Sequence, residues 1–184
     1  MPNRTEIKIA GFGGQGVVLA GYILGKAGSI YSNKHATLTQ SYGPEARLGT
    51  AKCDLVLSRH EIAYPQVRVP DFLLCLSREA YLKYGQDLAP GGVHVVDARA
   101  LEEGESADVV AVAITETAKD MGNILTTNTV ALGALIGLTG LVSDAELRHA
   151  LRARLKAEAL PVNEMAFDAG LHLGALARTS FSPV

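Results

Sequence analysis

Hydrophobic and polar residues alternate over short stretches in several parts of the chain, which is typical of strands with one buried face. Residues 6–10 alternate in this way. Residues 72–77 are apolar almost throughout, as expected for a strand covered on both faces. The pattern predicts strands at residues 6–10, 35–39, 51–57, 72–77, 93–97 and 108–114.

Longer stretches carry apolar residues at helical spacing. Leu147, Leu151 and Leu155 recur every four residues and therefore share one face of a helix. Ser143 and Glu146, just before them, have the spacing of a capping box that starts a helix. The pattern predicts helices at residues 16–30, 78–89, 115–121, 124–141, 144–158 and 162–177.

The predicted strands and helices alternate along the chain, which favours an α/β fold. We expect a three-layer α/β/α domain with a Rossmann-like, mostly parallel sheet. With 184 residues, 48% of them hydrophobic, the chain can bury a sizeable core. We expect one domain over residues 1–178 and a C-terminal tail over residues 179–184.

Composition narrows the classes of partner. The chain has 19 acidic and 17 basic residues, so no strong overall charge attracts nucleic acid or a membrane surface. The longest apolar run, residues 130–142, is shorter than the roughly 20 residues that span a bilayer. Its glycines fit close helix packing instead. The first residues carry no apolar signal region, so we expect a cytoplasmic protein without nucleic-acid or membrane partners.

A glycine-rich turn lies between the first predicted strand and the first predicted helix. Such a turn places backbone N–H groups at a helix N-terminus, where they bind phosphate or another anion. Its sequence is Gly11-Phe12-Gly13-Gly14-Gln15-Gly16, which also fits the dinucleotide pattern G-x-G-x-x-G. A dinucleotide site further needs an acid at the end of the second strand. Residues 35–41 contain none, so the pattern favours phosphate binding without an ordinary NAD site.

A second loop, residues 40–50, combines turn formers, hydroxyls and Arg47 between two predicted strands. We expect it to open on the same edge of the sheet as the glycine turn. Arg47 could then add a planar, permanently charged group to the N–H groups of the first loop. A solvated surface loop without a ligand is the alternative that composition alone leaves open.

The sequence offers no self-sufficient catalytic or metal centre. Cys53 and Cys75 lie far apart in apolar runs, which favours buried, reduced thiols, and an iron–sulfur cluster usually needs four thiolates. The five histidines lack metal-ligand spacing, and no G-x-S-x-G nucleophile motif is present. We therefore predict no catalytic residue and no metal ligand in this chain.

Two motifs together carry a resemblance to a known family: Gly-Phe-Gly-Gly-Gln-Gly-Val from Gly11 and Ser-Tyr-Gly-Pro-Glu-Ala-Arg from Ser41. With them, the chain resembles the gamma subunit of the 2-oxoacid:ferredoxin oxidoreductases, which act on pyruvate, 2-oxoglutarate or branched-chain 2-oxoacids such as ketoisovalerate. Further matches begin at Ile62, Pro70, Asn128 and Asn163, so the resemblance covers nearly the whole chain. The family usually has Arg-Gly-Gly where this chain has Arg47-Leu48-Gly49, and Leu48 lacks the conformational freedom of glycine.

The resemblance implies a role inside a complex. Such enzymes convert a 2-oxoacid, coenzyme A and oxidised ferredoxin to acyl-CoA, carbon dioxide and reduced ferredoxin. It implies alpha and beta subunits and a ferredoxin-like delta subunit or domain as partners, with ferredoxin as electron acceptor. Thiamine diphosphate, magnesium and the iron–sulfur clusters are expected in those partner subunits. The chain itself is expected to be inactive alone.

The resemblance also implies a contact between this chain and coenzyme A. The candidate binding residues lie in the two loops and at one further position: Gly11, Gly13, Gly14, Gln15, Gly16, Ser41, Tyr42, Arg47 and Asn128. Docking of both loops against the alpha subunit is an alternative for the same residues. Two further alternatives are a free-standing Rossmann-type nucleotide-binding oxidoreductase and a purely structural scaffold subunit.

Overall fold

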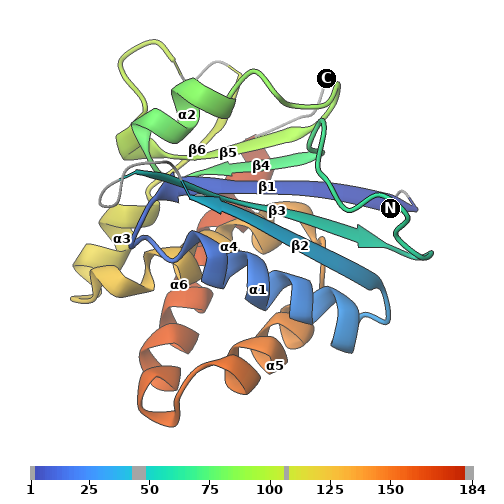
Figure 1. Cartoon of the computed structure of the whole chain (residues 1–184). Helices are drawn as coiled ribbons and strands as arrows, with labels where there is room; N and C mark the ends of the chain where they lie inside the picture. Colours follow the sequence, from blue (N-terminus) through green and yellow to red (C-terminus); the bar gives the residue numbers. More distant parts are fainter. Residues whose placement is uncertain (1–2, 43–48, 106–107, 181–184) are drawn as a thin grey trace.

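A computed structural model describes residues 3–42, 49–105 and 108–180 (Figure 1). The strands of this part of the chain are β1 (Arg4–Phe12), β2 (His35–Tyr42), β3 (Thr50–Ser58), β4 (Phe72–Cys75), β5 (Val93–Asp97) and β6 (Val110–Val112). The α-helices are α1 (Val17–Lys26), α2 (Arg78–Tyr84), α3 (Ile114–Asp120), α4 (Thr127–Thr139), α5 (Asp144–Arg154) and α6 (Leu160–Ser180). Short helical turns are η1 (Ala27–Tyr31), η2 (Ala98–Ala100), η3 (Ile124–Thr126) and η4 (Ala157–Ala159).

All six strands form one sheet in the order β2-β3-β1-β4-β5-β6. The pairings β1–β4, β4–β5 and β5–β6 are parallel, whereas β3 runs antiparallel to both β1 and β2. The prediction of a mostly parallel α/β sheet is therefore confirmed. The antiparallel part arises because β2 is followed directly by β3 as a hairpin, which needs no crossover helix.

The two faces of the sheet are covered unequally (Figure 1). Helices α1, α4, α5 and α6 lie on one face, and α2 lies on the other. Successive residues of β1 point to opposite faces. Ile7 and Ile9 belong to the large hydrophobic core with the first group of helices. Ala10 belongs to a smaller cluster with Ala80 of α2.

Each predicted strand and helix is present, with shifted ends. The first helix ends at Lys26 and continues as a π-helical turn, η1. Helix α2 ends at Tyr84 instead of residue 89, and β6 is shortened to Val110–Val112. Helix α6 continues through Ser180, two residues into the segment predicted as a tail, and residues 181–184 lie outside the described part.

The apolar run at residues 130–142 forms most of α4, which is nearly all buried. Helix α6 crosses it through glycines on both helices. A Cβ atom at Gly133 would lie 2.4 Å from the Phe167 carbonyl oxygen, and one at Gly174 would lie 2.1 Å from the Ala134 carbonyl oxygen. The backbones therefore touch at this crossing, as the glycines of the run predicted. None of the described helices has the length and apolar character needed to cross a bilayer.

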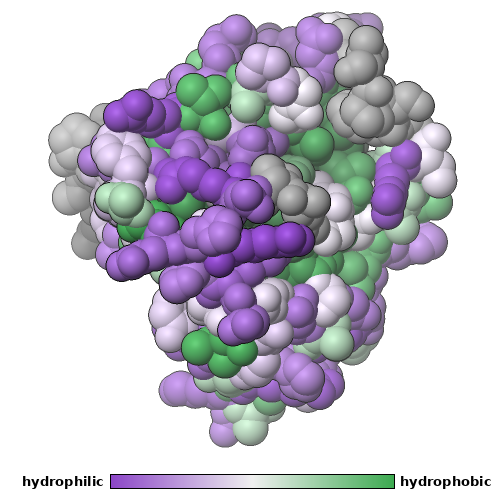
Figure 2. Space-filling view, turned by 90° about the vertical axis from the view of Figure 1, so that its right-hand side faces the viewer, coloured by the Kyte–Doolittle hydropathy of each residue, from purple (hydrophilic) through white to green (hydrophobic). Residues whose placement is uncertain are grey.

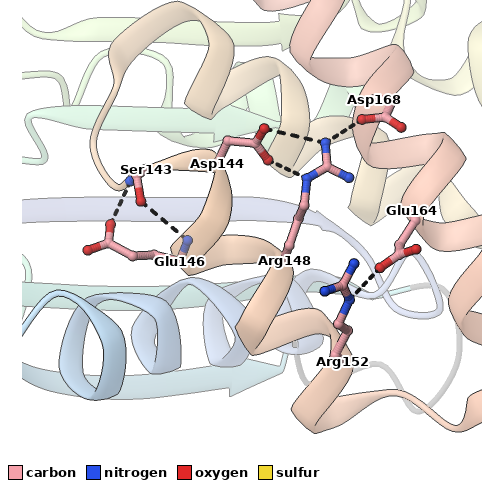
Figure 3. A network of polar contacts seen from close by, with 7 residues as sticks. All are labelled: Ser143, Asp144, Glu146, Arg148, Arg152, Glu164 and Asp168. Carbon is pink, nitrogen blue, oxygen red and sulfur yellow. Dashed lines mark hydrogen bonds and ion pairs between the residues drawn. The ribbon is translucent and has the colours of Figure 1, made fainter.

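The capping box at the start of α5 is confirmed (Figure 3). The Ser143 hydroxyl accepts a hydrogen bond from the Glu146 N–H at 3.3 Å, and the Glu146 carboxylate accepts one from the Ser143 N–H at 2.6 Å. Arg148 and Arg152 of α5 then join this helix to α6. Arg148 pairs with Asp144 of its own helix and with Asp168 of α6. These groups are partly exposed, so the ion pairs add little stability and mainly fix orientation.

The side of the molecule where β1 begins lies opposite the glycine turn (Figure 2). Hydrophilic side chains cover much of this side, and the hydrophobic ones exposed on it form smaller areas between them. The carboxyl ends of β1, β4 and β5 open on the other side. Two parts of the molecule bear on function: that side and the edge of the sheet at β2.

His94 of β5 is buried beneath α2. Its ring centroid lies 5.6 Å from that of Tyr81, and its Nε2 atom has no hydrogen-bond partner among the described residues. Burial lowers the pKa of His94 to about 4, because a buried imidazole loses the hydration that stabilises its charged form. His94 is therefore a buried residue of the sheet.

Gly137→Ala is expected to destabilise the protein because the new Cβ would lie 2.3 Å from the Leu171 carbonyl oxygen. Neither backbone can yield easily at that crossing, so we expect a loss of at least about 2 kcal/mol in urea unfolding. Gly25→Ala in α1 is the matched control. Its Cβ would meet only the flexible end of Leu55 at 3.1 Å. Equal losses in the two variants would contradict the close-contact interpretation.

His94 is expected to make stability depend on pH. Its pKa is about 4 in the folded state and near 6.5 in the unfolded chain. The unfolded state thus binds more protons in that window, and stability falls as pH falls from 6.5 toward 4. Between pH 7.5 and 5 the loss from this group should be roughly 2 kcal/mol. Urea unfolding of wild type and His94→Gln at both pH values measures it; identical pH dependence would contradict the assignment.

Candidate functional site

The candidate site lies at the point in the sheet where the helices that follow neighbouring strands change from one face of the sheet to the other. Strands β1 and β4 are adjacent and parallel. Helix α1 follows β1 on one face, and α2 follows β4 on the other (Figure 1). In open α/β sheets such a switch point leaves a crevice at the carboxyl ends of the two strands, and ligands bind there.

The glycine turn forms one wall of this crevice. Gly14 has a φ angle of 99° and Gly16 one of 72°, a left-handed backbone that glycine adopts without a steric penalty. Gly16 is the N-cap of α1, and no side chain caps this helix. The first N–H groups of α1 therefore remain available to an anion, since the helix itself cannot pair them.

Gln15 fixes the turn to the neighbouring strand. Its side-chain oxygen accepts a hydrogen bond from the Phe12 N–H at 2.6 Å, and its amide group donates one to the Leu76 carbonyl oxygen at 2.9 Å. A Cβ atom at Gly11 would lie 2.5 Å from the same Gln15 oxygen. Gly11 and Gln15 thus shape the turn, and a direct contact between Gln15 and a ligand stays a prediction.

Asn128, at the start of α4, lies directly against the turn. Its side chain is buried, with 3% of the residue exposed, and its amide group donates to the Gly16 carbonyl oxygen at 3.5 Å. A Cβ atom at Gly16 would lie 2.6 Å from the Asn128 Nδ2 atom. The fold therefore brings Asn128 to the glycine turn from 112 residues further along the chain.

The second loop opens on the same edge, as its position in the sequence predicted. The last residue of β2, Tyr42, lies opposite Ala51, and Phe12 lies opposite Thr50. The Gly13 N–H donates to the Gly49 carbonyl oxygen at 3.1 Å, so the two loops are in contact. Ser41 and Tyr42 are exposed there. Arg47 and Leu48 lie in residues 43–48, outside the described part of the chain.

A cavity of about 350 Å³ lies beside the glycine turn. It extends from Phe12 and Gln15 across the carboxyl ends of the parallel strands. Its further lining comes from the ends of β4 and β5, from the start of α3 and from η3: Leu76, Ser77, Arg78, Glu79, Asp97, Arg99, Ala100, Thr115 and Ile124. The glycine turn thus borders a space large enough for part of a nucleotide-like ligand.

Sequence reasoning missed two arginines of this cavity. Arg78 pairs with Glu102 and Glu105, and the hydrogen bond from Arg78 lowers the pKa of the Glu105 carboxyl. Arg99 is exposed at the cavity, and its side chain forms no hydrogen bond or ion pair with the described residues. Both follow predicted strands within three residues, a position at which side chains gather at the carboxyl edge. Their position just after predicted strands could have identified both arginines as candidates from the sequence.

Asp97 organises the far side of the cavity. Its carboxylate accepts hydrogen bonds from the Arg99 N–H at 3.3 Å and the Thr115 N–H at 3.1 Å, and from the Thr115 hydroxyl. The residue is 1% exposed. With these bonds Asp97 joins β5 to η2 and α3, at the start of a turn.

The two cysteines are buried and uncharged at neutral pH. Cys53 and Cys75 lie in different hydrophobic clusters, and burial raises the pKa of each thiol to about 12, so both stay protonated at neutral pH. Within residues 3–42, 49–105 and 108–180, no three His, Cys, Asp or Glu side chains gather as a metal site. The arrangement can hold an anion beside a polar cavity.

Comparison with known proteins agrees with this architecture. Residues 6–173 match the family model of pyruvate ferredoxin/flavodoxin oxidoreductase. The chain is 43% identical to the 2-oxoglutarate synthase subunit KorC of Methanothermobacter thermautotrophicus, over 92% of this chain and 95% of that one. It is 37% identical to the solved keto/oxoacid ferredoxin oxidoreductase gamma subunit of Geobacter sulfurreducens, with a TM-score of 0.85 over 96% of this chain and 99% of that one.

A third similarity concerns the fold alone. The solved 2-oxoglutarate:ferredoxin oxidoreductase of Magnetococcus marinus, with 2-oxoglutarate, coenzyme A and succinyl-CoA bound, is 24% identical, with a TM-score of 0.79. All of this chain aligns with 32% of that longer chain. The family match over most of the sequence and the 43% identity lead to one conclusion: the chain belongs to the pyruvate ferredoxin/flavodoxin oxidoreductase family.

Proposed function

We propose that this chain is the gamma subunit of a 2-oxoacid:ferredoxin oxidoreductase and that its glycine turn helps to bind coenzyme A. The complex would convert a 2-oxoacid, coenzyme A and oxidised ferredoxin to acyl-CoA, carbon dioxide and reduced ferredoxin. The observation that carries the proposal is the uncapped N-terminus of α1, at the switch point of the sheet and beside a cavity of about 350 Å³.

The glycine turn fits the phosphate part of coenzyme A. Gly13, Gly14 and Gly16 keep side chains away from the crevice, so a phosphate group could approach the backbone closely. Arg47 would add a charge-assisted contact from the second loop, and Ser41 and Tyr42 lie at the same edge. Asn128 supports the turn from behind by its contact with the Gly16 carbonyl oxygen.

The role of the chain in this reaction is positioning. Holding the phosphate end of coenzyme A fixes where its thiol can reach, which lowers the entropic cost of acyl transfer. Thiamine diphosphate, magnesium and the iron–sulfur clusters would be held by the alpha, beta and delta subunits. The buried, protonated thiols of Cys53 and Cys75 do not fit a cluster in this chain. On this proposal the subunit is inactive when isolated. The complex that contains it acts in the cytoplasm.

The 43% identity to a 2-oxoglutarate synthase subunit makes 2-oxoglutarate the first 2-oxoacid to test. Native co-purification through a tag on this chain should yield the complex. Its activity with 2-oxoglutarate, pyruvate and 2-oxoisovalerate then measures the preference. A chain that purifies without partners and is stabilised by NAD but not by coenzyme A would instead support a free-standing nucleotide-dependent enzyme.

Docking of the two loops against another subunit is the second candidate role. Tyr42 is 63% exposed and Leu125 of η3 is 80% exposed at this edge, which favours burial against a partner. The two roles differ in what a loop variant changes. A ligand contact changes the KM for coenzyme A in an assembled complex, whereas a docking contact changes assembly itself.

Gly16→Ala is expected to raise the KM for coenzyme A by about tenfold, because a left-handed alanine is strained by about 1 kcal/mol and its Cβ would displace Asn128. Steady-state kinetics of the purified complex measures the change. Gly122→Ala is the matched control, since Gly122 has a φ angle of 77° with open space around its Cβ position. Equal KM values for wild type and Gly16→Ala, with the complex intact, would contradict the proposed role of the turn.

Arg47→Ala is expected to raise the KM for coenzyme A by tens-fold, because a charge-assisted contact contributes roughly 1.5–3 kcal/mol. Decarboxylation of the 2-oxoacid, which precedes acyl transfer, should keep its rate. Arg47→Lys should recover part of the loss, since lysine keeps the charge without the planar group. If coenzyme A kinetics stay at wild-type values in the assembled complex, Arg47 has no such role.

A further inference from the structure

Within the described part of the chain, no strand pairs with the outer edge of β2. β2 is the last strand of the sheet, and only β3 pairs with it among the described residues. Its eight residues contain no proline, lysine, arginine, aspartate or glutamate, and His35 is its one histidine. Proteins usually protect a free edge with such residues, with a bulge or with a very short strand. β2 has the uncharged, regular form of a strand that pairs with another chain.

A groove lies beside this edge, where residues of α1 and η1 meet residues of β2 and β3. It has a volume of about 400 Å³ and is lined mainly by apolar groups of α1, η1 and β2, among them Tyr22, Ile30, Ala36 and Leu38. Tyr22 is 48% exposed and Ile30 is 66% exposed. An added strand would place alternate side chains over this groove, because side chains alternate between the two faces of a sheet.

The charges around the groove are positive. Lys26 lines it, and the Arg154 guanidinium lies 5.4 Å from the centre of the Tyr22 ring. The described lining contains no carboxylate. A segment that docks here with complementary charge therefore carries acidic residues beside its apolar ones.

A second copy of this chain fits the groove poorly. Two β2 strands paired about a two-fold axis would bring the two grooves together, because Ala36 and Leu38 of β2 line the groove. The Lys26 and Arg154 groups of both copies would then approach one another without carboxylates between them. Like charges brought together at an interface oppose such a dimer.

We infer that the β2 edge and its groove dock an extended, acidic and apolar segment of another subunit of the same complex, which pairs with β2 as an added strand. The inference rests on the proposed role as a subunit and goes beyond it, since it concerns the groove at Tyr22, Lys26 and Ile30, which contains no residue of the glycine turn. The same fold continues into a longer chain in the Magnetococcus marinus enzyme, where it makes up 32% of the length. Such a fold must therefore carry a surface for unlike neighbours.

The test compares two substitutions in the complex purified through a tag on this chain. Ile30→Asp places a negative charge in the groove and should weaken binding of the other subunits by about tenfold or more. Leu82→Asp on α2 is the matched control, because Leu82 is similarly exposed, at 61%, on the other face of the sheet. It should change binding less than twofold. Lys26→Glu should weaken binding and make it less sensitive to salt.

A photo-cross-linker at His35, exposed at the end of β2 away from the second loop, should capture an acidic segment of another subunit, whereas one at Lys83 on α2 should not capture that segment. Cross-linking to a second copy of this chain, or equal binding by wild type and Ile30→Asp, would overturn the inference. These failures differ from failure of the proposed function, in which the wild-type chain itself purifies without partner subunits.

Discussion

The structure depends on the close approach of four chain segments at the glycine turn. The turn leaves β1, contacts the β2–β3 hairpin through the Gly13–Gly49 hydrogen bond and contacts β4 through Gln15. Asn128 closes it from the start of α4. A side chain at Gly16 would occupy the space of Asn128, so the absence of a Cβ atom is what lets these segments meet. The switch-point crevice has its shape because of this contact.

The glycine crossing of α4 and α6 also supports the candidate site, although it lies further from it. It fixes α4 against α6 at backbone contact and thereby sets the position of the helix that carries Asn128. The Thr129 hydroxyl donates to the Asn163 side chain at 2.6 Å, which joins the two helices near their first turns. The uneven layers follow from this arrangement, because most of the apolar surface lies beneath one face of the sheet.

Much of the fold could be predicted from local patterns. Period-two alternation located the strands, and four-residue spacing located the helices, since both depend on which residues face the core. The capping box at Ser143 was predictable because its residues are three apart in sequence. The ends of the elements were less accurate. The π-helical turn at Ala27–Tyr31 and the early end of α2 at Tyr84 depend on packing that no local window contains.

The sequence by itself determined the α/β class, the place of the glycine turn between a strand and a helix, and the lack of an acid for NAD. Each of these depends on residue type and short spacing. Only the tertiary structure decided that Gln15 bonds to Leu76, that Asn128 lies against Gly16 and that Arg78 and Arg99 border the same cavity. Such contacts join residues tens to more than a hundred positions apart. They exist because the order of strands in the sheet brings their carboxyl ends to one edge, and local sequence does not encode that order.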